Sequence, residues 1–165
     1  MKKTEQGMIP LEIEHVCIVV RDRGKAMQRF SALTGAGFSR VFDVVHSEGI
    51  VYGKKTHFEG KLAFAQVGPT EIELIEPVKG ESIWGEFLRT KGEGVHHLGI
   101  FVPDLDKELA RFEELGIGVL QYGEGPDRPN PSPEATKSIS GGFVRTMATL
   151  NPCKTTPDLL PLQSK

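Results

Sequence analysis

Apolar and polar positions alternate along this chain with the periods of short strands and short helices. Residues 14–20 are rich in β-branched side chains and predict a buried strand, after which Asp22 can cap a helix that runs to about residue 33. Further extended segments, separated by Gly, Pro and Ser, are expected at residues 38–45, 50–54, 61–66 and 71–75. The first half of the chain therefore predicts a β-α-β-β-β unit with room for an extra hairpin strand. The apolar face of its helix would comprise Ala26, Met27, Phe30 and Leu33.

The second half of the chain repeats this pattern at a constant offset of 82 residues. The matched pairs include His15 with His97, Asp22 with Asp104, Lys25 with Lys107, Phe30 with Phe112 and Leu33 with Leu115. A fixed offset of about half the chain marks a duplicated unit rather than an array of short repeats. In the second copy we expect a strand at residues 99–102, a helix at 105–115 capped by Asp104, and later strands at 119–122 and 143–150. The apolar face of this second helix would comprise Leu105, Leu109, Phe112 and Leu115.

The two copies are expected to share one domain, because a chain of 165 residues is long enough for one core. We predict a flexible segment at residues 1–10, then a single domain at 11–165 whose modules occupy about 11–77 and 95–165. The linker between them carries a short helix capped by Ser82, with Trp84, Phe87 and Leu88 packed inward. Residues 123–142 contain four prolines and form either a disordered loop or a lid over a site. The loop has no aromatic residue that would hold it closed, which favours disorder.

Composition narrows the partners and the compartment. The net charge is -2 and basic residues are scattered among acidic ones, so no basic stripe is available for nucleic acid. The longest apolar runs are too short to cross a bilayer, and residues 1–7 lack the apolar core of a signal peptide. We therefore expect a cytoplasmic protein that binds neither nucleic acid nor membranes. Cys17 and Cys153 lack metal-type spacing, and Cys17 is expected to be a small buried side chain rather than half of a disulfide.

Three side chains could form a metal site. Strand positions two apart share a face, so Glu71 and Glu73 lie opposite Ile72. If the sheet curves, its first and last strands can aim His15, Glu73 and His97 at one point. Two imidazoles and a carboxylate suit Zn²⁺, Co²⁺, Ni²⁺, Mn²⁺ or Fe²⁺. A lone histidine of this kind is usually a satisfied core residue, but recurrence at matched repeat positions favours the metal.

With these residues the sequence resembles the vicinal oxygen chelate superfamily, which includes glyoxalases, bleomycin-resistance proteins, extradiol dioxygenases and methylmalonyl-CoA epimerases. The resemblance covers residues 13–122, and the stretches at 71–77, 87–88 and 92–98 are similar to those of methylmalonyl-CoA epimerases. It implies an α+β fold of paired βαβββ modules, with a curved mixed sheet that encloses a metal site. It also implies a small-molecule substrate such as an acyl-CoA, and we expect a homodimer.

The same resemblance implies the ligand set. The first ligand would be His15, the second Glu73, and the third His97, which matches His15 in the internal repeat. His96 alternates to the other face and would serve in packing or as a hydrogen-bond partner of a ligand. The chain departs from the epimerases near its end, because Pro161 stands where they carry a Glu that completes the metal's ligands. Asp158, Gln163 or water would take its place.

The resemblance implies a metal-dependent isomerase or epimerase that abstracts a proton α to a thioester carbonyl. Glu48 resembles the first-module Glu that epimerases use as an acid/base group, and its alternative role is a solvated hairpin residue. His46 and His57 are expected to be exposed loop residues. Two other functions stay open, namely a glyoxalase-like lyase acting on a small thioester and a non-catalytic binding protein of the bleomycin-resistance type. Metal content separates these classes, since a binding protein needs none.

Overall fold

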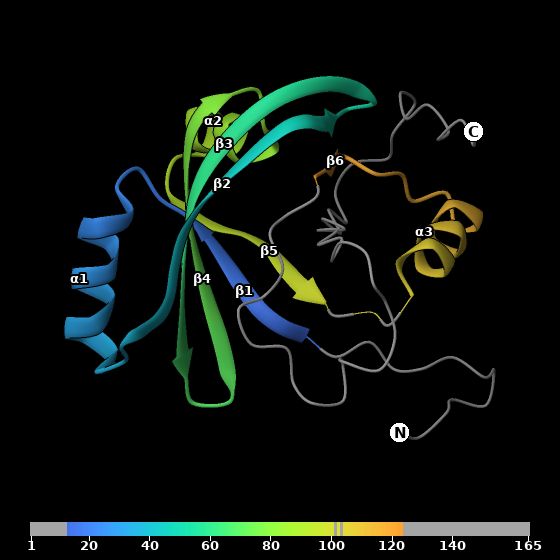
Figure 1. The fold of residues 1–165 in the computed structure, drawn as a ribbon. Coiled ribbons are helices and arrows are strands. Elements are labelled where there is room, and N and C mark those ends of the chain that lie inside the picture. Colours follow the sequence, from blue (N-terminus) through green and yellow to red (C-terminus); the bar gives the residue numbers. More distant parts are fainter. Residues whose placement is uncertain (1–12, 101, 103, 124–165) are drawn as a thin grey trace, which may run out of the picture.

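One mixed sheet of six strands curls into half a barrel in the computed structural model (Figure 1). The structure describes residues 13–100, 102 and 104–123. Its elements are β1 (Ile13–Val19), α1 (Arg23–Thr34), β2 (Phe38–Val51), β3 (Lys54–Val67), β4 (Thr70–Gly80), α2 (Ile83–Lys91), β5 (Gly94–Ile100), α3 (Leu105–Glu114) and β6 (Gln121–Tyr122). The strand order is β5-β1-β4-β3-β2-β6. β1 and β4 run parallel, and the other neighbouring pairs are antiparallel.

The first β-α-β-β-β unit forms as the sequence predicts, but its hairpin is longer. The segments expected at 38–45 and 50–54 are not two strands, because β2 continues to Val51 with an irregularity between His46 and Gly49. Tyr52 and Gly53 then form the turn to β3, with φ angles of 50° and 75°. Two consecutive residues with positive φ are typical of the tight type I′ turn, whose twist matches that of the flanking strands.

The second copy begins with the same local structure as the first. Asp22 and Asp104 are the N-caps of α1 and α3, and each side chain accepts a hydrogen bond from the backbone N–H of the lysine three residues on, Lys25 or Lys107, at 2.9 and 3.1 Å. The strand expected at 99–102 instead spans Gly94–Ile100, because it pairs with β1 along that length. The predicted strand at 143–150, the segment 1–10 and the loop from residue 124 onward lie outside the described residues.

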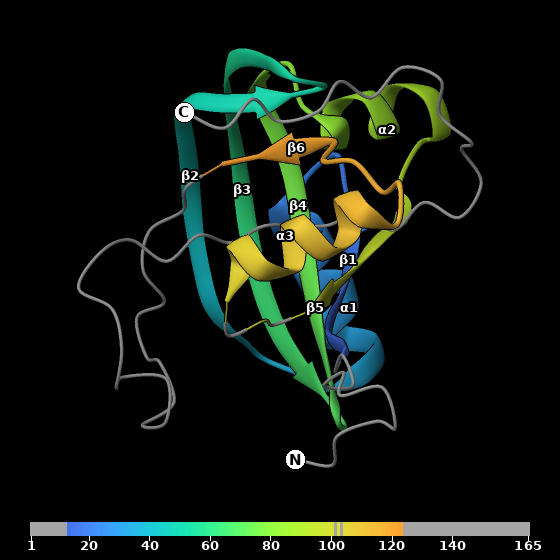
Figure 2. The ribbon, with the colours of Figure 1, turned by 90° about the vertical axis from the view of Figure 1, so that its right-hand side faces the viewer.

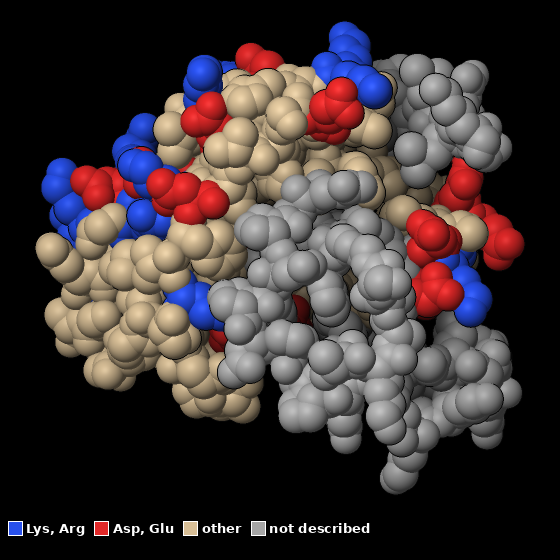
Figure 3. Space-filling model, viewed as in Figure 1, with Lys and Arg blue, Asp and Glu red and all other residues tan. Residues whose placement is uncertain are grey.

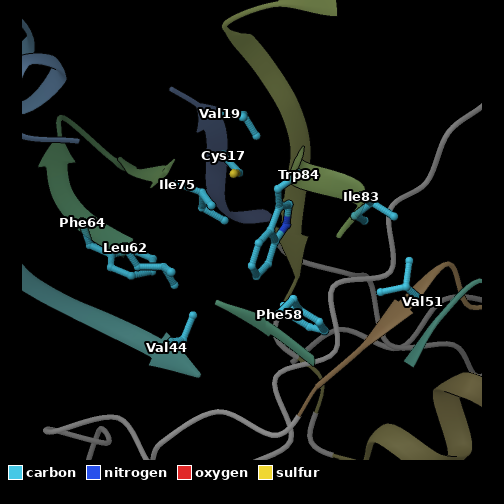
Figure 4. Close-up of a cluster of buried hydrophobic side chains, with 10 residues drawn as sticks. All are labelled: Cys17, Val19, Val44, Val51, Phe58, Leu62, Phe64, Ile75, Ile83 and Trp84. Atoms are coloured by element: carbon cyan, nitrogen blue, oxygen red, sulfur yellow. The ribbon is translucent and has the colours of Figure 1, made fainter. Parts of the chain in front are cut away.

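Each face of the sheet has its own core. On the outer face α1 covers Val20, Ala63 and Leu74 through Ala26 and Met27. The opposite, inner face carries a larger cluster: Cys17, Val19, Val44, Val51, Phe58, Leu62, Phe64, Ile75, Ile83 and Trp84 (Figure 4). The helices α1 and α3 lie on opposite sides of the sheet (Figures 1 and 2). The inner face therefore lies on the side of α3.

Two leucines that were expected to pack inward are exposed. Leu33 is 84% exposed and Leu115 is 62% exposed, so these two expectations were wrong. Leu33 lies in the last turn of α1, next to the helix end at Gly35, and Leu115 is the C-cap of α3. Trp84 packs inward as predicted, because its side chain is buried. The predicted cap is also confirmed, because Ser82 is the N-cap of α2.

Charged side chains of both signs are mixed on the molecular surface. On the face in Figure 3, lysines and arginines lie close to acidic side chains over the described residues. Within the described part of the chain, none of the helices has the length and apolar character needed to cross a membrane.

Candidate metal centre

Three adjacent strands bring His15, Glu73 and His97 together. β1 lies between β4 and β5, and its Cys17 is in register with Glu73 on one side and with His97 on the other. His15 precedes Cys17 by two positions and therefore shares its face of the sheet. All three side chains are buried, with exposures of 2%, 0% and 5%. One ligand atom from each lies within 4.8 Å of the others.

Both imidazoles direct the same nitrogen at the carboxylate. Glu73 Oε2 lies 3.1 Å from His15 Nε2 and 3.6 Å from His97 Nε2. The two imidazole rings are 5.8 Å apart and nearly perpendicular, at 77°. Ligands held about 2.1 Å from one cation at angles of 90–109° are about 3.0–3.4 Å apart. The two separations to the carboxylate are close to this range and all three ligand atoms lie within 4.8 Å of one another, so the three side chains could hold a metal ion.

The second nitrogen of the His97 ring has a hydrogen-bond partner, whereas that of His15 lies near a carboxylate beyond hydrogen-bond distance. His15 Nδ1 lies 3.7 Å from Glu14 Oε2, and His97 Nδ1 lies 2.8 Å from His96 Nδ1. Burial, together with the neighbouring His97, lowers the pKa of His96 to about 4. A neutral His96 can accept a hydrogen bond from His97 Nδ1–H, which leaves a lone pair on His97 Nε2. Metal-binding histidines are usually oriented in this way by a partner on the second nitrogen.

Gly99 supports the His15 ring from β5. Gly99 and His15 are partners in the antiparallel register of β1 and β5. A Cβ atom at position 99 would lie 1.9 Å from His15 Cε1 and 2.2 Å from Nε2. Only a residue without a side chain fits beneath this imidazole. A glycine inside a strand often marks such a close approach, and this signal could have identified Gly99 from the sequence.

The chemistry of the group fits a divalent cation. A carboxylate that is removed from water needs a charged or hydrogen-bonding partner, and Glu73 is fully buried beside two imidazoles. Two imidazoles and a carboxylate are ligands typical of Zn²⁺ and of the neighbouring transition metals, and three protein ligands leave positions for substrate or water.

The other residues considered from the sequence lie elsewhere or outside the description. Glu48 is exposed, at the irregularity of β2, and the structure does not bring it into the cluster of His15, Glu73 and His97. Pro161, Asp158 and Gln163 lie outside the described residues.

His46 and His57 are not loop residues, contrary to expectation. His46 lies in β2, is 9% exposed and packs against the Phe58 ring at 4.6 Å. His57 lies in β3 and contacts Glu59 at 2.7 Å. The hairpin of β2 and β3 extends further than the sequence pattern indicates, and it includes both residues.

Comparisons with known proteins agree with this fold. A family model described as the Glyoxalase/Bleomycin resistance protein/Dioxygenase superfamily matches residues 14–130. The uncharacterized protein YqjC of Bacillus subtilis (strain 168) is 29% identical over 108 residues, which cover 66% of this chain and 69% of that protein.

Two solved structures have a fold similar to that of this chain. The hypothetical protein BH1468 from Bacillus halodurans C-125 has a TM-score of 0.55 at 22% identity, covering 72% of this chain and 86% of that one. A variant of Streptomyces coelicolor methylmalonyl-CoA epimerase in complex with 2-nitronate-propionyl-CoA has a TM-score of 0.54 at 25% identity, covering 71% and 77%. Since the family model spans more than half of the chain and the curled α+β sheet agrees with it, the chain belongs to the glyoxalase/bleomycin resistance protein/dioxygenase superfamily.

Proposed function

We propose that this protein is a metal-dependent enzyme of the isomerase or epimerase type, which removes the proton α to the carbonyl of an acyl thioester. The observation that carries the proposal is the buried convergence of His15, Glu73 and His97 on the inner face of the sheet. Similarity to epimerase structures that hold methylmalonyl-CoA or 2-nitronate-propionyl-CoA supports the choice of substrate.

The residues of the cluster would bind the metal, and their neighbours would position the two imidazole rings. His15, Glu73 and His97 would hold the metal, His96 would orient the ring of His97 through its Nδ1, and Gly99 leaves room for the ring of His15. A divalent cation bound there would supply Lewis acidity toward two neighbouring substrate oxygens and stabilise the negative charge of an enolate.

The surroundings of the cluster would keep the reacting part of the substrate apart from water. The Phe64 ring lies edge-on to His15, with centroids 6.1 Å apart, and Phe42 stacks on Phe64 at 5.9 Å. Apolar walls strengthen electrostatic interactions within a site. Glu48 is the proposed proton acceptor, and from its place on β2 it would have to approach the substrate across the curl of the hairpin.

Metal content is the first test. We expect about one divalent transition-metal ion per chain in wild type, measured by elemental analysis, and strong loss in His15→Ala and His97→Ala. His57→Ala removes a histidine of β3 outside the cluster and should keep its metal. Equal metal content in wild type and in both cluster variants would refute the site.

Solvent exchange is the test of the chemistry. In heavy water, methylmalonyl-CoA should gain deuterium at the α carbon faster with protein than without it, and a chelator should abolish the difference. Glu48→Gln keeps the shape of the side chain and removes its base, so it should stop the exchange while metal is retained. If metal-loaded wild type exchanges neither acyl-CoA nor glutathione thioesters, the protein is a binding protein rather than an enzyme of this type.

The proposal also covers the oligomeric state of the protein and the residue that completes the metal's ligands. We expect a homodimer, which light scattering of the purified protein would detect.

With Pro161 at the position of the epimerase glutamate, Asp158, Gln163 or water would complete the ligands of the metal. The variant Pro161→Glu should therefore bind metal more tightly than wild type.

A further inference from the structure

The two histidines of the cluster are held in different ways. His97 Nδ1 has a hydrogen-bond partner in His96. His15 Nδ1 lies 3.7 Å from Glu14 Oε2, and among the residues that the structure describes it has no hydrogen-bond partner. Metal-binding histidines are usually oriented by a hydrogen bond on the second nitrogen. The ring of His15 must therefore be oriented by packing against its neighbours.

The Phe64 ring limits how the His15 ring can turn. The two rings are nearly perpendicular, at 86°, and their centroids are 6.1 Å apart. Perpendicular aromatic pairs attract each other at centroid separations of about 4.5–7 Å. The imidazole lies over Gly99 of β5, and Phe64 belongs to β3, on the other side of β1 in the sheet. Phe64 therefore restricts the rotation of the imidazole toward β3.

Phe64 is itself held by two side chains of β2. Arg40 is its register partner, and the central carbon of the guanidinium lies 4.1 Å from the centre of the ring. Phe42 stacks on the same ring at 5.9 Å, with 16° between the planes. A cation is attracted to the negative face of an aromatic ring. The fully buried Phe64 ring thus has little freedom to turn away from His15.

Glu71 keeps the guanidinium in this place. Arg40 Nη2 donates a hydrogen bond to Glu71 Oε1. The two side chains are only 19% and 17% exposed, and an ion pair sheltered from water is less screened than one on the open surface. Glu71 lies on β4, in register with His15 on β1. The contacts therefore run from His15 through Phe64 and Arg40 back to the strand position beside His15.

We propose that Arg40 is a positioning residue of the metal centre, which holds Phe64 against His15 and so sets the orientation of this ligand. The inference rests on the proposed function, because it takes His15 to be a ligand of the metal. Arg40 acts through Phe64 and itself contacts neither metal nor substrate.

The direction of the effect distinguishes positioning from charge. Arg40→Met removes a positive charge near a cation site, so Coulomb repulsion alone predicts tighter metal binding. The positioning role predicts weaker binding, because His15 loses the support of Phe64. Loss of a direct partner of a ligand costs about 10–100-fold in metal affinity, and Arg40 acts one contact further away. We therefore expect Zn²⁺ to bind about three- to ten-fold more weakly, measured by competition with a chromophoric chelator.

The chain offers a matched control on α3. The guanidinium of Arg111 lies 4.7 Å from the centre of the Phe112 ring and donates to Glu108. Arg111 thus makes the same two kinds of contact as Arg40 without being connected to His15 through Phe64. Arg111→Met should leave the affinity for Zn²⁺ unchanged.

A double variant tests whether Arg40 acts through the ring. Phe64→Leu should itself weaken Zn²⁺ binding about ten-fold or more, and Arg40→Met in this background should cause no further loss. Additive losses would overturn the inference, as would unchanged or tighter binding in Arg40→Met alone. If Arg40→Met melts at a much lower temperature than wild type, Arg40→Lys replaces it. This variant keeps the charge without the flat group and should also weaken Zn²⁺ binding.

The orientation of His15 can be observed without any metal. The Phe64 ring shifts the NMR signals of the imidazole protons of His15, which are identified by their absence in His15→Ala. In EDTA-treated protein, Arg40→Met should move these signals and Arg111→Met should not. If wild type binds no Zn²⁺ but the signals move, the proposed function fails and the role of Arg40 stands. If wild type binds Zn²⁺ and the signals stay in place in Arg40→Met, the inference fails alone.

Discussion

Replacing Gly99 with alanine should disable the metal centre through a single methyl group. The added Cβ would lie 1.9 Å from His15 Cε1, 2.2 Å from Nε2 and 2.3 Å from Nδ1. Non-bonded carbon atoms prefer separations of about 3.5–4.0 Å, so the imidazole would have to retreat by about 1.5–2 Å. A metal ligand has to be held within about 0.5 Å of its productive position. His15 would therefore no longer contribute to the cluster.

Two magnitudes follow for Gly99→Ala. Overpacking of a buried site costs about 1–3 kcal/mol of folding stability, which a denaturant titration of the metal-free protein would detect. Disturbing only a partner of a ligand costs about 10–100-fold in metal affinity, and displacing the ligand itself should cost at least the upper end of that range. Competition with a chromophoric chelator for Zn²⁺ or Co²⁺ measures the affinity directly.

The controls separate this clash from the general effect of an added methyl group. Gly37→Ala adds the same methyl group where nothing lies within 4 Å, and it should leave metal affinity unchanged. In a His15→Ala background the ring is gone, so Gly99→Ala should cause little further loss of affinity or stability. Wild-type metal affinity in a folded Gly99→Ala variant, or full additivity with His15→Ala, would refute the reasoning.

Three further variants test other contacts. His96→Ala should retain metal stoichiometry but bind about ten-fold more weakly, because His97 loses its orienting partner, and elemental analysis with the chelator assay would show both. Burial, and then the hydrogen bond to Glu86, raises the pKa of Tyr52 from 10.0 to about 12. As the pH rises, the Tyr52 hydroxyl therefore loses its proton in the unfolded chain before it does in the folded chain, and the free energy of unfolding should fall between pH 10 and 12. Tyr52→Phe should reduce that fall. In urea titrations near neutral pH the same variant should lose about 0.5–1.5 kcal/mol of folding stability. Gln121→Leu leaves the buried Ile83 N–H without its acceptor and should cost about 1–3 kcal/mol in the same assay, whereas an unchanged midpoint would contradict the contact.

Features that depend on local chemistry could be predicted from the sequence. The caps Asp22, Asp104 and Ser82 act within three residues of themselves, so each helix start was correct. The period of two along a strand placed Glu73 on the face opposite Ile72, and the internal repeat identified His15 and His97 as a pair. These regularities need no knowledge of distant contacts.

Features that depend on tertiary contacts could not be predicted from the sequence. The exposure of Leu33, in the last turn of α1, depends on what the end of that helix packs against, and the helical period carries no such information. The stacking of Arg40 on Phe64 requires the register between β2 and β3, which shifts between Phe38 and Arg40 and again between His46 and Gly49. Glu48 was assigned by resemblance alone, and its distance from the cluster depends on the length of that hairpin.

The position of β1 between β5 and β4 has a consequence for how the chain folds. β2, β3 and β4 follow one another in sequence and pair as neighbours, whereas β1 pairs in parallel with β4 and also with β5, both of which lie far along the chain. Contacts between distant segments form slowly, because the closure of long loops costs entropy before any contact is gained. β1 should therefore dock late, and its arrival brings His15 to Glu73 and His97. A metal ion that needs all three would bind only the completed sheet, so a concentration one hundred times its dissociation constant would add about 2.7 kcal/mol to the stability of the folded state.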